Sequence, residues 1–320
     1  MSTKVSLLQI LRENEDCFVS GAELAERLSV SRTAVWKAVS QLRAEGYRIR
    51  SVRNKGHCLS SARDVLSATG VEDYLKTTGI RVQYFRKISS TNTVLKMMAA
   101  EGAAEGLVLI AEEQSGGKGR LGRSFFSPPG SGLYMSILLR PETDAAHSTD
   151  ITACAAVAAA LAIEELSGEP AAIKWVNDIY VNDKKAVGIL TEGAFAPDGS
   201  YQYAVIGIGV NLFEPVGGFP ENIKETATAV FSSEQDEALR RSFLQKMLQR
   251  IKFYYEQLPE TPFLPLYRER QMIYKRSILF SDTDGIKRGI AVGIDDSFRL
   301  LVKTADGAVH AVERGDVSVL

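Results

Sequence analysis

Hydrophobic residues in the first 45 positions recur at the spacing of short amphipathic helices. Helices are predicted over residues 4–12 and 22–28, and Ser20 followed by Glu23 is a capping-box pair in front of the second. A third helix is predicted to begin at an N-cap, Ser31, and to turn two valines and a leucine toward the other helices. Two helices joined by a turn of three or four residues are typical of a helix-turn-helix.

After the third helix the pattern changes from the helical period to alternation. Residues 47–53 alternate as a strand, 54–56 form a turn and 57–59 return, which predicts a two-stranded wing. Positive charge gathers here, because residues 31–55 hold seven Lys/Arg and one Asp/Glu. Such cations contact DNA phosphates, and side chains early in the third helix would reach base edges. The candidate DNA contacts are Ser31, Arg32, Thr33, Trp36, Lys37, Arg48 and Arg53.

From residue 82 onward, apolar runs and helical periods together predict an α+β region, after a linker and short helix at 60–79. Strands are predicted at 82–87, 107–111, 133–139, 179–182, 186–193 and 202–211, and helices at 92–101, 150–166 and 236–257. Residues 276–320 alternate in five short runs, which is typical of an SH3-like β-barrel. The predicted domains are a winged helix-turn-helix at 1–63, a mixed α/β catalytic domain at 64–270 and the barrel at 271–320.

The net charge of −1 hides an uneven distribution, since residues 1–63 carry +5 and the remainder −6. A basic end on an acidic body is typical of a polyanion-binding module joined to a second function. Cys17, Cys58 and Cys154 give no disulfide or metal pattern, so we expect no metal site and a buried position for each cysteine. The most apolar run, residues 151–163, is too short to cross a bilayer, and no signal-peptide pattern precedes it. A cytoplasmic protein without membrane contact is predicted.

The segment from Ala111 to Arg123, AEEQSGGKGRLGR, carries the clearest chemical signal. Its glycines let backbone N–H groups close on an anion, whose charge three cations could neutralise. Residues 117–122 fit the dinucleotide pattern G-x-G-x-x-G, but that motif needs a following helix, and Ser-Phe-Phe-Ser-Pro-Pro-Gly cannot begin one. The sequence therefore predicts an anion-binding loop between two strands, with a solvated basic hairpin as the alternative.

Four further segments combine polar groups that a small ligand could use. Residues 89–92 open a helix. Their hydroxyls and amide either cap that helix or contact the neutral head of a small ligand. Residues 174–178 place a cation, an aromatic ring and a carboxylate in a loop before a strand. Residues 184–190 form a turn that leads into a strand, with a lysine where the site would be. The alternative is that residues 183–185 form an ordinary solvated turn. Residues 207–211 end a strand whose glycines permit close backbone approach, so that the final asparagine can reach a phosphate or ribose.

Five short motifs, in this order, resemble those of the bifunctional biotin–protein ligases that also repress the biotin operon, the BirA type. They are Ser-Thr-Asn, Gln-x-x-Gly-Lys-Gly-Arg-x-x-Arg, Lys-Trp-x-Asn-Asp, Lys-x-x-Gly-Ile-Leu and Gly-x-Gly-x-Asn, and the resemblance extends through essentially the whole chain. It implies a catalytic domain related to class II aminoacyl-tRNA synthetases and lipoate ligases. The biotin contacts it implies are Ser90, Thr91, Asn92, Gln114, Lys118, Gly119, Arg120 and Lys185. The nucleotide contacts it implies are Arg123, Lys174, Asn177, Asp178 and Asn211, and the catalytic residues are Lys185, Arg120 and Arg123.

The resemblance also implies a reaction and its partners. Biotin and Mg²⁺-bound ATP would give biotinyl-5′-AMP and pyrophosphate, and a lysine of a biotin carboxyl carrier domain would then attack the mixed anhydride. A homodimer promoted by biotinyl-5′-AMP would bind operator DNA.

Two alternatives stay open beside this interpretation: a biotin-sensing repressor without turnover, and a ligase for a related acid such as lipoate. Intact Lys185, Arg120 and Arg123 argue against the first, and the winged helix together with the complete glycine-rich loop argues against the second. Lys118 and Val176 stand where arginine and proline are usual in relatives, and the second change puts the rigidity of its loop in question. Neither change removes a group that the reaction requires.

Overall fold

The computed structural model describes residues 3–14, 17–44, 47, 49–52, 55–59, 79–142, 147–232, 236–258, 260–282, 285–313, 315 and 317–320. The chain forms two compact units. The first is Met1–Tyr74 with Asp236–Arg241, and the second is Leu75–Gln235 with Ser242–Leu320.

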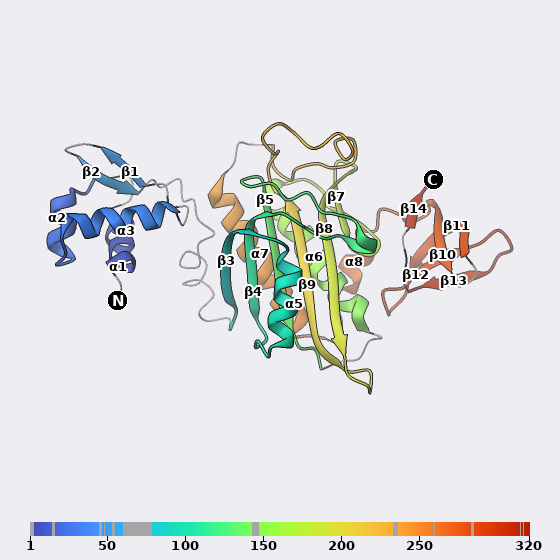
Figure 1. The fold of residues 1–320 in the computed structure, drawn as a ribbon. Coiled ribbons are helices and arrows are strands. Elements are labelled where there is room, and N and C mark those ends of the chain that lie inside the picture. The colour runs from blue at the N-terminus through green and yellow to red at the C-terminus, as the bar shows by residue number, and fades with distance from the viewer. Residues whose placement is uncertain are drawn as a thin grey trace. The chain divides into compact units, whose positions relative to one another are not determined.

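The described residues of the first unit form three helices and a two-stranded hairpin (Figure 1). They are α1 (Thr3–Glu13), α2 (Gly21–Arg27), α3 (Arg32–Ala44), β1 (Ile49–Val52) and β2 (Gly56–Leu59). Both predicted N-caps form, because the hydroxyls of Ser20 and Ser31 each accept a hydrogen bond from a backbone N–H three residues on, at 3.1 Å. The strands pair antiparallel. The predicted winged helix-turn-helix is confirmed.

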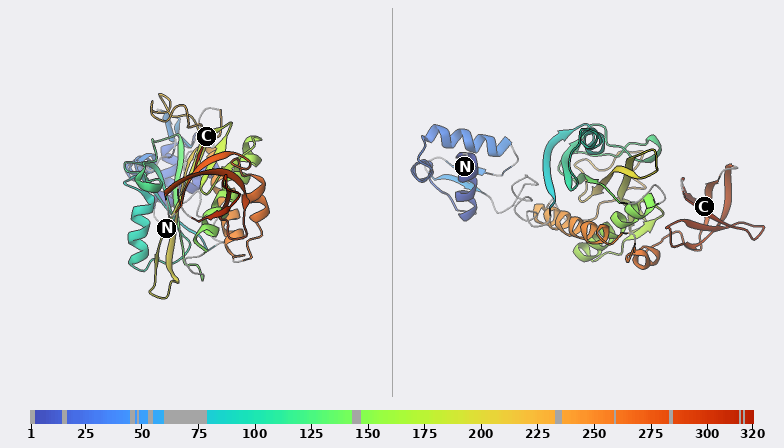
Figure 2. Two further views of the ribbon diagram at one scale, coloured as in Figure 1. Left: turned by 90° about the vertical axis from the view of Figure 1, so that its right-hand side faces the viewer. Right: turned by 90° about the horizontal axis from the view of Figure 1, so that it is seen from below.

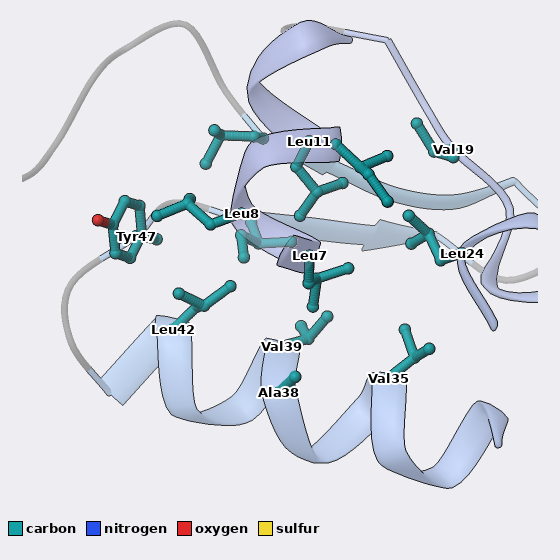
Figure 3. Packing of buried hydrophobic residues seen from close by; sticks show 13 residues of the cluster. Leu7, Leu8, Leu11, Val19, Leu24, Val35, Ala38, Val39, Leu42 and Tyr47 are labelled. Atoms are coloured by element: carbon teal, nitrogen blue, oxygen red, sulfur yellow. The ribbon is translucent and has the colours of Figure 1, made fainter. Parts of the chain in front are cut away.

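The core of this unit is mostly aliphatic, with Tyr47 at its edge, and all three helices contribute to it (Figure 3). Its fully buried leucines lie on α1, α2 and the inner face of α3, where Val35 and Val39 join them. Arg43 of α3 donates to the Ile49 carbonyl at 2.8 Å and to the Ser51 hydroxyl at 2.6 Å, and thereby ties the helix to the wing.

The candidate DNA contacts of α3 lie away from this core. Ser31, Arg32, Thr33, Trp36 and Lys37 are all exposed. Trp36 is 62% exposed, which is unusual for so large an apolar ring and marks a surface available to a partner. Arg48 and Arg53 lie outside the described residues.

The second unit is built on a seven-stranded sheet with the order β3-β4-β5-β9-β8-β7-β6 (Figure 1). Its strands are β3 (Arg81–Ile88), β4 (Leu107–Gln114), β5 (Gly132–Leu139), β6 (Ala172–Lys174), β7 (Asp178–Val181), β8 (Lys184–Phe195) and β9 (Tyr201–Asn211). β3 and β4 run parallel, and the other neighbours are antiparallel.

Helices cover both faces of this sheet (Figure 2). They are α5 (Thr91–Ala100), α6 (Ser148–Ser167), α7 (Glu237–Tyr255) and the short α8 (Leu264–Glu269). Alternation along β5 explains the two cores, because Leu138 packs with α5 while Ile137 and Leu139 face Leu248 and Ile251 of α7.

After α8 the chain forms a five-stranded antiparallel sheet with the order β13-β12-β11-β10-β14. Its strands are β10 (Ser277–Asp282), β11 (Gly285–Ile294), β12 (Leu300–Lys303), β13 (Val309–Val312) and β14 (Val317–Val319). The predicted strand-rich C-terminal region is confirmed. The predicted domain boundaries at 63 and 270 stay predictions.

The predicted α+β pattern of the central region is confirmed, with three corrections. β4 extends to Gln114, β8 begins at Lys184 where a turn was predicted, and the three-residue β6 was missed because so short a strand shows no alternation. The predicted linker and short helix at 60–79 fall, apart from the final residue, outside the described residues. Cys58 and Cys154 are buried as expected, but Cys17 is exposed. No described helix is long and apolar enough to cross a bilayer.

Candidate active site

One cavity in the second unit collects most of the residues that the motifs predicted. Its walls come from the start of α5, the end of β4, the glycine-rich loop (residues 115–124), the β6–β7 turn and the middle of β8 and β9. The predicted residues that line it are Ser90, Thr91, Asn92, Gln114, Lys118, Gly119, Arg120, Arg123, Asn177, Asp178 and Lys185. Segments up to 119 residues apart in sequence therefore meet at one place, from Ser90 to Gly209.

Two predicted nucleotide contacts lie elsewhere. Lys174 is the last residue of β6, pairs with Asp178 across the turn and is not among the residues that line the cavity. Asn211 ends β9, where its carbonyl accepts a hydrogen bond from the Val230 backbone at 2.8 Å, and it is also outside the lining. Their assignment to a nucleotide stays a prediction.

The glycine-rich loop joins β4 to β5, as predicted, and no Rossmann helix comes after it. It contains a single three-residue 3₁₀ turn, Arg120–Gly122, in which Leu121 has the left-handed φ of 55°. The loop is closed on itself by backbone hydrogen bonds from Gly119 to Arg123 at 2.7 Å and from Phe125 to Gly117 at 2.9 Å. Its side chains Lys118, Arg120 and Arg123 all line the cavity.

One set of neutral hydrogen-bonding groups is what we call the neutral wall: Ser90, Thr91, Asn92 and Gln114, which line the cavity, and Ser136, which supports them from behind. Gln114 Oε1 accepts from the backbone N–H of Thr91 at 2.9 Å and from its hydroxyl at 3.1 Å. Gln114 Nε2 donates to Ser127 at 3.1 Å. These contacts fix which end of the amide is donor and which is acceptor.

Two serines, Ser90 and Ser136, support the neutral wall where α5 begins. The Ser90 hydroxyl accepts from the Thr93 backbone at 3.4 Å, so it caps α5 while it also borders the cavity. Ser136 on β5 is fully buried, and its hydroxyl lies 2.7 Å from Thr91 Oγ1 and 2.6 Å from Asn92 Oδ1, so its one proton can go to either acceptor. The motifs missed Ser136, although a single serine within the apolar run of β5 is a signal of a buried polar contact.

Glycines in β8 and β9 shape the floor. A Cβ on Gly207 would stand 2.2 Å from Asn92 Oδ1, and one on Gly209 would stand 2.5 Å from the Phe125 ring. Gly188 lies beneath the same ring and beside Lys185. Phe125 was not predicted as a site residue, yet it lines the cavity over a floor that only glycine permits.

A second set of lining residues carries charge, and we call it the cationic wall: Arg120, Asn177, Asp178 and Lys185. Arg120 donates to Asn177 Oδ1 at 2.9 Å and to the backbone carbonyl of Gly315 at 2.8 Å. Lys185 Nζ lies 2.8 Å from Asp178 Oδ1. Each cation therefore has a protein acceptor that an anionic ligand could replace.

The β6–β7 turn that carries Asn177 and Asp178 is held from the C-terminal side. The peptide bond from Trp175 to Val176 is cis. The Trp175 indole donates to the Phe298 carbonyl at 2.9 Å, and the buried Tyr267 hydroxyl donates to the Val176 carbonyl at 3.0 Å. Asn177 adds a bond from Nδ2 to the Ile189 carbonyl at 2.8 Å. These contacts position the turn.

The residues that line the cavity offer few ligands to a metal ion. Among the described residues, no group of three or more His, Cys, Asp or Glu side chains could hold one. Asp178 is the carboxylate that lines the cavity. A magnesium ion fits here as a partner of nucleotide phosphates, since Mg²⁺ in such sites keeps water and phosphate ligands and uses one or two carboxylates.

Three family models match this chain. The biotin/lipoate A/B protein ligase family matches residues 84–211, a helix-turn-helix domain matches 4–57 and the biotin protein ligase C terminal domain matches 276–320. The bifunctional ligase/repressor BirA of Bacillus subtilis is 34% identical over 306 residues, with 94% of each chain covered. The chain belongs to the bifunctional biotin ligase/repressor family.

The chain is also similar to two further curated proteins and to a solved structure. BirA of Escherichia coli is 28% identical and covers 98% of this chain. The biotin–[acetyl-CoA-carboxylase] ligase of Paracoccus denitrificans is 30% identical over 236 residues, or 69% of this chain. The structure of the Aquifex aeolicus biotin protein ligase in complex with biotin and ATP superimposes with a TM-score of 0.61 at 24% identity, over 75% of this chain and 98% of that one, which shows a shared fold.

Proposed function

We propose that the cavity binds biotin with its neutral wall and activates it with ATP along its cationic wall. The observation that carries the proposal is the meeting of two chemically different walls in one cavity. Amides and hydroxyls in fixed orientation suit the neutral ureido ring of biotin. Arg120 and Lys185 suit the carboxylate and the phosphate that react with each other.

The first step joins the biotin carboxylate to the α-phosphorus of ATP and releases pyrophosphate. Negative charge accumulates around phosphorus in this step, and Lys185, Arg120 and Arg123 are the groups that offset it. Mg²⁺ would enter with the nucleotide, with Asp178 as its nearest candidate ligand. In the second step the ε-amine of a carrier lysine attacks the mixed anhydride, AMP leaves, and the amine proton is lost to solvent. The glycine-rich loop would shield the adenylate from water in the interval.

Mass spectrometry of a biotin carboxyl carrier domain tests the ligase function. Incubation with this protein, biotin and ATP should add one biotin to one lysine, and release of pyrophosphate should not need the carrier. Replacing biotin with lipoate is the matched control for acid specificity. A protein that binds biotin but releases no pyrophosphate would instead be a sensor without turnover.

The exposed face of α3 supports a second role in operator binding. We propose that Ser31, Arg32, Thr33, Trp36 and Lys37, with Arg48 and Arg53, contact DNA. Neutralising Arg32, Lys37, Arg48 and Arg53 together should reduce the salt dependence of operator binding, because fewer phosphate counterions are released. A truncated protein that begins at Ser67 should still biotinylate the carrier and fail to shift DNA. An unchanged salt slope in the four-residue variant would contradict the assignment.

We also propose that biotinyl-5′-AMP promotes a homodimer in the cytoplasm, and that the dimer binds the operator. One recognition helix reads few bases, so two copies on a palindromic site provide useful specificity. A glycine-rich loop ordered by the adenylate loses less entropy on joining a dimer surface.

The test is sedimentation of wild type and Arg120→Gly, each with and without biotin plus ATP. Wild type should dimerise and Arg120→Gly should not. The variant loses the guanidinium that would hold the adenylate, and its loop gains backbone freedom. Equal dimerisation would contradict the coupling.

A further inference from the structure

Asn92 borders the cavity, but its amide is used by the protein. Its Nδ2 donates to the Leu190 carbonyl at 3.2 Å and to Glu192 Oε2 at 2.9 Å, so both hydrogens are engaged. Its Oδ1 accepts from Ser136 at 2.6 Å and presses against the backbone at Gly207. Asn92 is 4% exposed. It therefore has no donor left for a ligand and acts on its neighbours.

Two acceptors, the Leu190 carbonyl and the Glu192 carboxylate, draw the Asn92 amide nitrogen toward β8, and Glu192 is the one that a side-chain substitution can change. Its second oxygen, Oε1, forms an ion pair with Lys96 of α5. Burial raises the pKa of Glu192, but hydrogen bonds from Lys96 and Asn92, with further help from the charge of Lys118, outweigh burial and leave the pKa below its usual value. The side chain is thus an ionised carboxylate at neutral pH, which only accepts hydrogen bonds. If the Asn92 amide were rotated, its oxygen would face the Glu192 carboxylate and be repelled. The amide nitrogen, Nδ2, therefore faces Glu192.

The orientation of Asn92 is passed to the neutral wall through Ser136. The Ser136 hydroxyl has one proton and two acceptors in reach, Thr91 Oγ1 at 2.7 Å and Asn92 Oδ1 at 2.6 Å. A rotated amide would present Nδ2 to Ser136 and force the proton toward Thr91. Thr91 contacts Gln114 through both its N–H and its hydroxyl, so the change would reach the group that faces the ligand.

We infer that Glu192 is a positioning residue for biotin recognition: by fixing the Asn92 amide, it sets the donor and acceptor pattern of Ser136, Thr91 and Gln114. The inference rests on the proposed binding of biotin by the neutral wall. It assigns Asn92 to the support of the site in place of the direct ligand contact that the motifs implied.

Glu192→Gln is the decisive variant, because glutamine keeps the shape and can donate or accept toward Asn92. In ATP–pyrophosphate exchange, we expect KM for biotin to rise about tenfold, as for one misplaced buried hydrogen bond. KM for ATP and kcat at saturating biotin should stay within about twofold, since the hydrogen-bond and ion-pair partners of Glu192 are Asn92 and Lys96, which are not residues of the cationic wall. Ser136→Ala should shift KM for biotin in the same direction, and the double variant should cost less than the product of the two.

Two further variants separate orientation from charge. Lys96→Met keeps the carboxylate and should change KM for biotin less than Glu192→Gln does. Glu113→Gln breaks the exposed Lys87–Glu113 pair between β3 and β4, outside the cavity lining, and should change nothing. Thermal melts of all variants identify any loss of fold. An unchanged KM for biotin in folded Glu192→Gln would overturn the inference, and so would a fall in kcat alone.

Calorimetry of biotin binding without ATP distinguishes this inference from the proposed function. If wild type binds biotin about tenfold more tightly than Glu192→Gln but releases no pyrophosphate, the ligase function fails and the inference stands. If wild type releases pyrophosphate and both proteins bind biotin equally, the inference fails and the ligase function stands. Absence of biotin binding by wild type would overturn both.

Discussion

The two walls of the cavity are built by opposite means. On the neutral wall, Thr91, Gln114 and Ser136 satisfy one another, so the hydrogen-bonding pattern exists before a ligand arrives. On the cationic wall, Arg120 and Lys185 contact Asn177, Gly315 and Asp178, all acceptors that an anion can replace. A pre-formed pattern favours selectivity, because a mismatched ligand leaves buried polar groups unpaired. Exchangeable partners favour charge stabilisation as the reaction proceeds.

The largest expected effect comes from the cationic wall. Lys185→Ala should lower adenylate formation by about 100- to 1000-fold, the range seen when one group that stabilises developing charge is removed. Biotin's neutral head would still meet an intact neutral wall. The readout is pyrophosphate release at saturating biotin and ATP.

Lys174→Ala is the matched control, since Lys174 is close in sequence to the site but outside the cavity lining. We expect it to stay within about threefold of wild type, as for an exposed or half-exposed charge. If Lys174→Ala were the more damaging of the two, the cationic wall would be wrongly assigned.

A methyl group can break the neutral wall without touching a charge. In Gly207→Ala the new Cβ would meet Asn92 Oδ1 at 2.2 Å, which forces the asparagine from its place. We expect biotin affinity, measured by calorimetry, to fall about 30-fold, while binding of ATP alone changes little. Gly293→Ala, on a strand position with nothing within 4 Å, is the control for the substitution itself. Equal losses of biotin and ATP binding would mean that the walls are not separable.

The smallest expected effect tests how the β6–β7 turn supports Asn177. Tyr267→Phe leaves the Val176 carbonyl without its donor and should raise KM for ATP about three- to tenfold, as for one buried hydrogen bond. Tyr255→Phe removes another tyrosine hydroxyl, more exposed and bonded to Glu105 at 2.7 Å, outside the cavity lining, and should leave KM for ATP unchanged. An effect on KM for biotin alone would contradict the role given to the turn.

The sequence predicted most elements and much of the cavity because its signals are local. The N-caps of Ser20 and Ser31, the wing and the strand periods depend on neighbouring residues, and the prolines and glycine after the glycine-rich loop were enough to place it between two strands. Local signals could not place three further residues: Ser136, Glu192 and Phe125. The partners of Ser136 and Glu192 lie 44 or more residues away in sequence. Phe125 lies over Gly188 and Gly209, which belong to distant strands. Lys174 belongs to the same motif as Asn177 but does not line the cavity, because it ends the short strand β6. The sequence did not predict that strand.

A crystal structure with a non-hydrolysable analogue of biotinyl-5′-AMP tests the contrast between the walls most directly. The neutral wall should be unchanged, with Gln114 still accepting from Thr91 and Asn92 still bonded to Ser136 and Glu192. Arg120 should have left the Gly315 carbonyl, and Lys185 should have exchanged Asp178 for an oxygen of the ligand, because charged acceptors bind these cations more strongly. A complex in which Arg120 and Lys185 keep their protein partners while the Gln114 or Asn92 amide turns around would contradict the account.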